Sequence, residues 1–167
     1  MSYRLRSATL SDFEALVHLS VLSFSSGLSG AYAPDLIEQS VPFISQVSKP
    51  LIQSGQLYVA EVDDCVLVGA GGWSRDYHGV PSVAGVGHIR QFVVHPDWMR
   101  HGIGRALFDR CLNAAPDIVQ FDCQASLSAI SFYHSLGFEE VCEDEVELPN
   151  GIIFPTCLMR YHRPADH

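Results

Sequence analysis

The stretch VVHPDWMRHGIGRAL, residues 93–107, joins an apolar run to a segment with helical spacing. The apolar run closes a predicted strand, Pro96 follows it, and Gly102 and Gly104 stand where a helix is expected to begin. The first turn of a helix has unpaired backbone N–H groups, and the helix dipole adds partial positive charge there. Because glycines let the backbone approach a bulky anion, the stretch predicts a phosphate or pyrophosphate site made of amides.

Two common phosphate-binding motifs do not fit this stretch. A P-loop needs a lysine and a hydroxyl residue after its second glycine, and GIGRAL has neither. A dinucleotide-binding fold needs G-x-G-x-x-G, and Leu107 occupies the third glycine position. The two glycines alone are equally compatible with a tight strand-to-helix turn. A second motif is therefore needed to distinguish an anion site from such a turn.

Outward from this stretch, periodicity predicts a single mixed α/β (α+β) domain over residues 1–167. The order of elements predicts a mostly antiparallel, twisted sheet of about seven strands flanked by about four helices. The strand–helix–strand unit around 88–125 supplies the one parallel pair, through a right-handed crossover. Ser11 is the expected N-cap of the first helix, and Pro42 and Pro50 are expected to interrupt the second. Strands are predicted over 3–8, at two places within 56–74, and over 88–94, 117–125, 139–148 and 152–161; helices are predicted over 9–24, 34–55, 102–115 and 128–138.

A second motif, SLSAISFYHSLGFEEV at 126–141, follows a predicted strand by a few residues. Together the two segments resemble the GNAT acetyltransferase superfamily. In that family a strand ending V-x-P leads into [QR]-x-x-G-x-[GA] and a helix, and a later helix reads A-x-x-[FL]-Y-x-x-x-G-F. Here these patterns fall at 94–104 and 129–138. The resemblance covers nearly the whole chain and implies the GNAT fold.

The resemblance also implies acetyl-CoA as the cosubstrate and assigns roles by position. The amides of 100–105 would hold the pyrophosphate, and the backbone of Phe92 and Val94 would pair with the pantetheine arm as an added strand. The Val94 N–H, near a bulge, would polarise the thioester carbonyl, and Tyr133 would protonate the leaving thiolate. A packed core tyrosine is the alternative for Tyr133. The implied donor-binding residues are Phe92, Val93, Val94, Met99, Arg100, His101, Gly102, Ile103, Gly104, Arg105, Ser126 and Tyr133.

Two residues depart from the family pattern. Met99 stands where Gln or Arg is preferred, which removes one side-chain contact to phosphate unless Arg100 or Arg105 supplies it. Ser126 stands where many members have Asn, which weakens one pantetheine contact. Neither change removes the amide cradle.

The acceptor side is predicted from the strand at 88–94. His88 and Arg90 share one face by the period of two, and a histidine has a pKa suited to a general base. An ordered water is an alternative base, and further candidates are Asp76, Tyr77, His78 and Glu61. Arg90 cannot act as a base, so it is expected to pair either with an anionic group on the acceptor or with an internal acid. Trp73 and Tyr77, together with Tyr32 and Phe24, are expected either to wall the acceptor cleft or to pack in the core.

The composition of the chain argues against several classes of binding partner. The net charge of −9 disfavours nucleic acid, which requires clustered Lys and Arg. Five cysteines without C-x-x-C spacing predict reduced thiols, and no metal site is expected. No stretch is apolar enough to cross a bilayer, so no membrane association and a cytoplasmic location are expected.

These observations predict an N-acetyltransferase that moves the acetyl group directly to a primary amine of a small molecule. A non-catalytic acyl-CoA-binding module and an acetyltransferase of protein N-termini or side chains are the alternatives. A homodimer is compatible with the family, and no sequence feature tests it.

Overall fold

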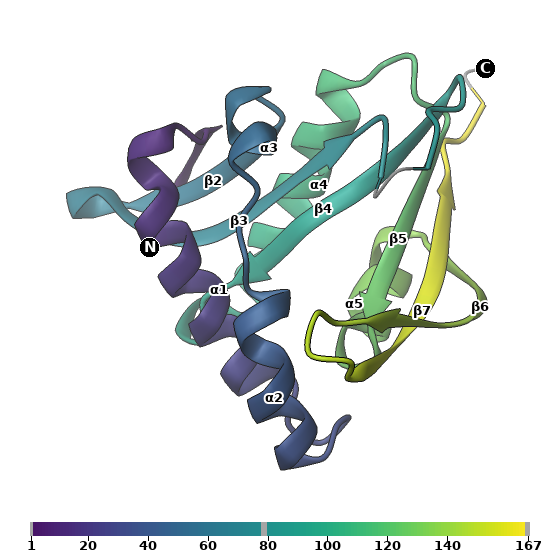
Figure 1. The fold of residues 1–167 in the computed structure, drawn as a ribbon. Helices are drawn as coiled ribbons and strands as arrows, with labels where there is room; N and C mark the ends of the chain where they lie inside the picture. The colour runs from purple at the N-terminus through teal and green to yellow at the C-terminus, as the bar shows by residue number, and fades with distance from the viewer. Residues whose placement is uncertain (1, 78–79, 166–167) are drawn as a thin grey trace.

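The computed structural model describes residues 2–77 and 80–165 and forms one seven-stranded mixed sheet (Figure 1). The spatial order of the strands is β1-β2-β3-β4-β5-β7-β6, and β4 and β5 form the parallel pair. This confirms the predicted crossover and the largely antiparallel sheet. The strands are β1 (Arg4–Ser7), β2 (Leu57–Val62), β3 (Val66–Ser74), β4 (Val86–Val94), β5 (Gln120–Ser126), β6 (Glu139–Glu147) and β7 (Ile153–His162).

Five α-helices lie in the described part of the chain, one more than the sequence predicts. The extra helix arises because the segment 34–55 forms two separate helices. Pro42 lies inside the first without ending it, and Pro50 lies in the first turn of the second, where its missing N–H is harmless. The helices are α1 (Phe13–Gly27), α2 (Pro34–Ile44), α3 (Lys49–Gln53), α4 (Ile103–Ala114) and α5 (Ile130–Leu136).

The start of α1 differs from the predicted cap at Ser11. A short 3₁₀ turn, Leu10–Asp12, precedes the helix, and the N-cap of that turn is Thr9. The Asp12 carboxylate accepts a hydrogen bond from the Thr9 N–H at 2.8 Å. The capping signal therefore lies two residues earlier than predicted, because Asp12 serves this turn as the acidic partner.

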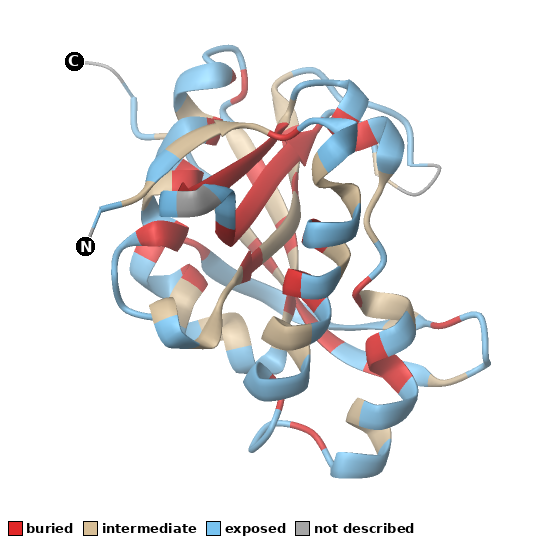
Figure 2. Cartoon of the chain, turned by 90° about the vertical axis from the view of Figure 1, so that its left-hand side faces the viewer, coloured by how far each residue is buried: buried red, intermediate tan, exposed pale blue. Residues whose placement is uncertain are grey.

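The sheet is covered on both faces, which makes three layers. One core cluster joins the sheet to α4 and α5 through Leu107, Phe108 and Tyr133. A second joins the other face to α1 and α3 through Leu16 and Leu51. Figure 2 shows the buried residues concentrated in the central strands and on the helix surfaces turned toward them. Covering both faces explains why β2 is apolar at successive positions rather than at alternate ones.

The pairing between β4 and β5 is short. Only Val86, Gly87 and His88 have partners on β5, namely Gln120, Phe121 and Asp122. Beyond these three pairs the two strands diverge, and Figure 1 shows the separation widening toward the C-terminal end of each strand. The sheet therefore opens at its centre, and both sequence motifs follow the strands that border this opening.

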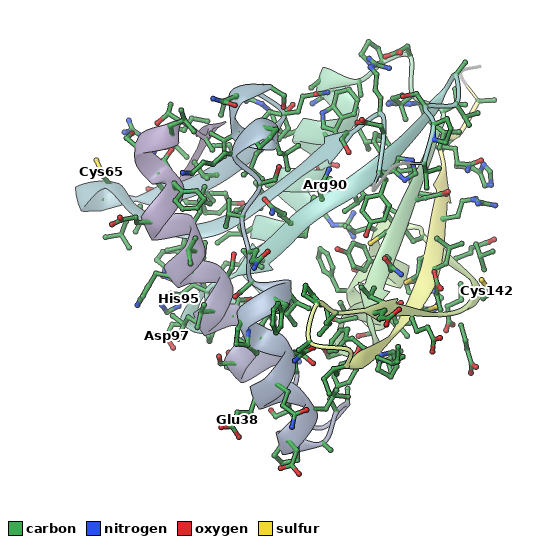
Figure 3. All side chains as sticks on the ribbon, viewed as in Figure 1. Glu38, Cys65, Arg90, His95, Asp97 and Cys142 are labelled. Carbon is green, nitrogen blue, oxygen red and sulfur yellow. The ribbon has the colours of Figure 1, made fainter. Side chains whose placement is uncertain are left out.

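The two strands predicted over 139–148 and 152–161 are confirmed as β6 and β7. β6 is an edge strand, and its acidic run, Glu143–Glu145 with Glu147, is exposed. All five cysteines are free thiols, and Figure 3 shows Cys65 and Cys142 at opposite sides of the molecule.

Candidate active site

A β-bulge interrupts β4 at the opening of the sheet. Gln91 has a φ of 57°, in the left-handed region, and with Phe92 it faces the single residue Gly71 of β3. The flanking pairs are Gly72 with Arg90 and Ala70 with Val93. Because a bulge adds one residue, Arg90 lies on the same face of the sheet as Val93 and on the opposite face from Phe92. The side chains of Arg90 and Val93 therefore lie on one face of the sheet beside the opening, and that of Phe92 lies on the other face.

The backbone of Val94 faces the open side of β4. His95 donates its N–H to the Val68 carbonyl on β3 at 2.8 Å. Backbone groups alternate along an antiparallel ladder, so the N–H of Val94 points away from β3. At this position β4 has no strand partner on its other side, because its pairing with β5 ends at His88. The bulge itself lies at Gln91 and Phe92, two to three residues before Val94.

The start of α4 has the free backbone amides that the predicted cradle requires. Gly102 is the N-cap, with a φ of 77° that favours glycine. The first backbone hydrogen bond of the helix runs from the Ala106 N–H to the Gly102 carbonyl, at 2.9 Å. The N–H groups of residues 103–105 therefore lack intrahelical acceptors, as expected for a first turn. Free amides beside a glycine N-cap suit the phosphates of a nucleotide-bearing ligand.

Gly104 is required by packing as well. A Cβ atom at this position would lie 2.5 Å from Cζ of Phe132, which belongs to α5. The second motif therefore packs directly on the first, through the ring that precedes Tyr133. This contact explains why a glycine is needed in the first turn of α4, whatever the ligand.

The side chains around the cradle have distinct roles. The guanidinium of Arg105 donates to the Ser135 carbonyl at 2.6 Å, which links α4 to the end of α5. The His101 ring lies 2.9 Å from the Met99 carbonyl and contacts Trp98. Met99 is 57% exposed and Arg100 is exposed as well. Of the two arginines predicted to replace the missing contact at Met99, Arg100 is the one whose guanidinium forms no hydrogen bond or ion pair within the described residues.

A cleft of about 520 Å³ lies at the opening between β4 and β5. The bulge region of β4 forms one wall, and Cys123 to Ser126 of β5 form another. Further lining comes from helices α1, α2 and α5, from the connection between α2 and α3, and from the β6–β7 hairpin. Among the residues predicted to bind the donor, those that line the cleft are Phe92, Val93, Ser126 and Tyr133.

Tyr133 is a buried titratable group of this cleft, as is its neighbour Cys123. Tyr133 is 6% exposed and packs against Phe92, Phe132 and Phe138 at ring distances of 5.0–6.5 Å. Burial, followed by the neighbouring Cys123 thiol, raises the pKa of Tyr133 well above its usual value. The hydroxyl therefore keeps its proton throughout the physiological range. Tyr133 therefore packs in the core and also lines the cleft, and its role as an acid stays a prediction.

Arg90 and Tyr77 line the other face of the cleft, and Figure 3 shows Arg90 on β4. The guanidinium of Arg90 donates to Ser74 Oγ at 3.1 Å and lies 5.7 Å from the centre of the Tyr77 ring. The Tyr77 hydroxyl donates to Gln124 Oε1 on β5 at 2.9 Å. These contacts hold the two side chains against the wall of the cleft.

Trp73 does not line the cleft. It is 3% exposed, its indole N–H donates to the Tyr58 hydroxyl at 3.3 Å, and its ring meets Phe121 edge to face. Trp73 is therefore a core residue, and Tyr32 is likewise outside the lining. Phe24, from α1, does line the cleft.

His88 lies two residues before Arg90, where β4 is still paired with β5. Its ring stacks on Tyr77 at 5.5 Å, and His88 is outside the residues that line the cleft. Desolvation lowers the pKa of His88 below its usual value, so the ring is neutral near pH 7. The geometry therefore brings Tyr77, rather than His88, to the surface of the cleft.

The other predicted bases lie in different places. Glu61 is 2% exposed and bound by Arg4 and Arg6, away from the cleft. Asp76 is exposed, and His78 lies outside the described residues. The carboxylate that does line the cleft is Glu147, at the end of β6. Glu147 belongs to the exposed acidic run of β6, and only the position of the β6–β7 turn reveals its place in the cleft.

A mixed sheet that opens beside a helix with free amides is suited to an extended, phosphate-bearing ligand next to a cleft. The chain matches the model of the acetyltransferase (GNAT) domain family over residues 29–157. It therefore belongs to the GNAT acetyltransferase family. A comparison with curated proteins found no significant match.

Solved structures share this fold. A GCN5-related N-acetyltransferase from Rhodopseudomonas palustris is 22% identical with a TM-score of 0.77, the match covering 97% of this chain and 96% of that one. The PaiA N-acetyltransferase from Thermoplasma acidophilum, solved with coenzyme A, is 18% identical with a TM-score of 0.71, covering 97% and 99%. The ribosomal-protein-S18-alanine N-acetyltransferase from Escherichia coli is 17% identical with a TM-score of 0.63, covering 99% and 97%.

Two features are absent from the described residues. None of the helices in residues 2–77 and 80–165 has the length and apolar character needed to span a membrane. The same residues contain no group of three His, Cys, Asp or Glu side chains that could hold a metal ion.

Proposed function

We propose that the protein transfers the acetyl group of acetyl-CoA to the primary amine of a small molecule. The observation that carries the proposal is the buried, protonated hydroxyl of Tyr133 in a cleft beside the unpaired backbone of β4. Acetyl-CoA would supply the activated acetyl thioester. The free amides of 103–105 and the exposed guanidinium of Arg100 are suited to its phosphates.

The roles of the chain's own residues follow from their positions. The N–H of Val94 faces the open side of β4, where it can donate to an oxygen that gains negative charge. Phe92, at the bulge, brings a second stretch of backbone to the same opening. Tyr133 holds a proton at its hydroxyl, because its raised pKa keeps the group protonated, and it can donate this proton as negative charge develops on the departing sulfur.

The base that accepts the proton of the amine has two candidates besides an ordered water. Glu147 lines the cleft directly and is exposed to solvent. His88 is neutral near pH 7 but lies behind Tyr77, so it would act through that residue or through water. A shift in the acid limb of the pH–rate profile in Glu147→Gln or His88→Gln would identify the base.

A small acceptor is favoured over a protein segment by an apolar contact at one end of the cleft, where Leu148 and Phe154 line it. Leu28, Tyr32 and Val41, from the α1–α2 region, pack against Leu148 and Phe154 of the β6–β7 hairpin. This apolar contact joins the two sides of the acceptor end. A folded protein surface would have to separate them to enter.

The test is release of free thiol from acetyl-CoA in the presence of a panel of amines, with Tyr133→Phe measured beside the wild type. We expect amine-dependent release that falls at least tenfold in Tyr133→Phe, because general acid catalysis contributes about 10²–10⁴-fold. Coenzyme A binding should change little, because the ring is retained. Binding without release for every amine and for peptide acceptors would contradict the proposal and favour a binding module.

A further inference from the structure

We propose that the acceptor carries a carboxylate besides its amine, with the size of a free apolar amino acid, and that Arg90 binds this carboxylate. The inference rests on the proposed acetyl transfer and names its substrate class. Three observations carry it: the lack of an acid beside Arg90, the face of the sheet that Arg90 occupies, and a buried hydroxyl in the same cleft.

Arg90 has no acidic partner in the described part of the chain. Four other arginines form ion pairs with carboxylates, and two more donate to backbone carbonyls. These six are Arg4, Arg6, Arg75, Arg160, Arg105 and Arg163. Arg90 instead contacts two neutral groups, Ser74 Oγ and the Tyr77 ring. In a chain of net charge −9, a half-buried arginine without an acid is a site for an external anion.

The bulge sets where this anion would lie. Arg90 faces the acceptor side of the sheet, whereas Phe92 faces the side of α4 and α5. The two residues flank Gln91, so the guanidinium of Arg90 and the open backbone of β4 belong to the same short stretch of strand. Arg90 could hold a carboxylate while the amine reaches the backbone beyond the bulge.

Thr156 supplies an independent sign of a ligand in this cleft. Its side chain lines the cleft from β7 and is 5% exposed, yet Oγ1 has no hydrogen-bond partner. Gln91 Oε1, at the bulge, is also buried without a partner. Buried polar atoms are nearly always satisfied. A carboxylate can accept a hydrogen bond from the Thr156 hydroxyl, and an ammonium or amine can donate to Gln91.

The rest of the lining favours an apolar side chain on the acceptor. Phe24, Phe43 and Phe154 line the cleft from α1, α2 and β7. The negative charge of the whole protein does not oppose a carboxylate at this position, because charges more than about 8–10 Å away are screened at physiological ionic strength. Among the described residues that line the cleft, Arg90 is the cation that can pair with a carboxylate, and Glu147 is the carboxylate that can face the amine.

The experiment compares leucine, phenylalanine and methionine with their amides, which keep the amine and the side chain but lack the carboxylate. We expect kcat/KM for the wild type to be at least tenfold higher for the acids. In Arg90→Gln the value for the acids should fall at least tenfold and that for the amides less than threefold. Arg90→Lys should be intermediate, because it retains charge without the bidentate fork. Thr156→Val, an isosteric change, should raise KM for the acids by severalfold.

The matched control is Arg110→Gln, which removes one positive charge from an exposed position on α4 and should leave the acid-to-amide ratio within twofold. Thermal melting of each variant confirms that it is folded. If the amines are acetylated but Arg90→Gln does not change the ratio of kcat/KM for the acids to that for the amides, the inference is overturned. The proposed acetyl transfer would then still stand. If no amine is acetylated, calorimetric binding of leucine in the presence of coenzyme A decides. Binding weakened at least tenfold by Arg90→Gln would support the carboxylate site alone, and binding independent of Arg90 would overturn both proposals.

Discussion

Gln91 shows at the scale of one residue how the opening of the sheet is maintained. It adopts a φ of 57°, which is unfavourable for a residue with a Cβ atom. Its side-chain amide donates to the Gln46 carbonyl at 2.9 Å, in the connection between α2 and α3. The side chain thus compensates in part for the unfavourable backbone, and it links the bulge to a segment that lines the cleft.

Two substitutions separate these effects. Gln91→Ala removes the link to Gln46 and keeps the unfavourable φ, whereas Gln91→Gly removes both. We expect Gln91→Gly to be more stable than Gln91→Ala by about 1 kcal/mol, because glycine adopts this φ without steric cost. Urea denaturation of both variants measures the difference. An alanine variant that is the more stable of the two would show that the left-handed backbone carries no cost here.

At the scale of elements, the two motifs act together because α5 packs on the first turn of α4. Phe132 occupies the space beside Gly104, so a Cβ atom there would force the ring to move. We expect Gly104→Ala to cost about 1–3 kcal/mol, as overpacking does, and to weaken coenzyme A binding because the first-turn amides shift. Thermal melting and a coenzyme A titration measure the two effects.

Gly27, near the end of α1, provides the matched control. A Cβ atom at Gly27 would have no neighbour within 4 Å, and its backbone lies outside the left-handed region. Gly27→Ala should therefore be neutral or stabilising by up to about 1 kcal/mol. Equal losses from both alanine variants would show that Phe132 does not constrain Gly104.

The sequence predicts the elements better than it predicts the site. Alternating and apolar runs determine the seven strands, and the two motifs locate α4 and α5, because these features depend on nearby residues. The sequence could not distinguish the roles of Trp73 and Tyr77, because both are aromatic and close in sequence. The strand register places Trp73 in the core, whereas Tyr77 lines the cleft. The bulge at Gln91 and the place of Glu147 depend on pairing between distant strands, which no local pattern encodes.

At the scale of the whole molecule, an ion-pair network fastens the N-terminal strand to the sheet. Arg6 contacts Asp12 at 2.8 Å and Glu61 at 3.2 Å, and Arg4 contacts Glu61 at 2.6 Å. Arg6, followed by Arg4, lowers the pKa of Glu61, and Arg6 lowers the pKa of Asp12. The carboxylates are therefore more acidic in the folded protein than in the unfolded chain.

This difference predicts how stability depends on pH. A carboxyl group with a lowered folded-state pKa stabilises the fold above its unfolded value of about 4, and this contribution is lost as the pH falls through the folded pKa. Glu61→Gln should therefore lose stability at pH 7 and show a shallower decline between about pH 5 and pH 2. Urea denaturation across this range is the measurement.

Glu38→Gln is the control, because Glu38 is an exposed residue of α2 that forms no ion pair within the described residues (Figure 3). Its pH dependence should match that of the wild type. A decline in Glu61→Gln as steep as in the wild type would show that the network does not contribute to acid sensitivity.

Because the contact between β4 and β5 is short, hydrogen exchange at the backbone of β4 is expected to change when the donor binds. Three residue pairs join one half of the sheet to the other, and the N–H of Val94 has no strand beside it. If an extended acyl donor lies there, the sheet is completed when the donor binds and interrupted when the product leaves. The Val94 amide would then exchange its hydrogen slowly only while the donor is present. Its exchange rate would distinguish the donor-bound protein from the free protein.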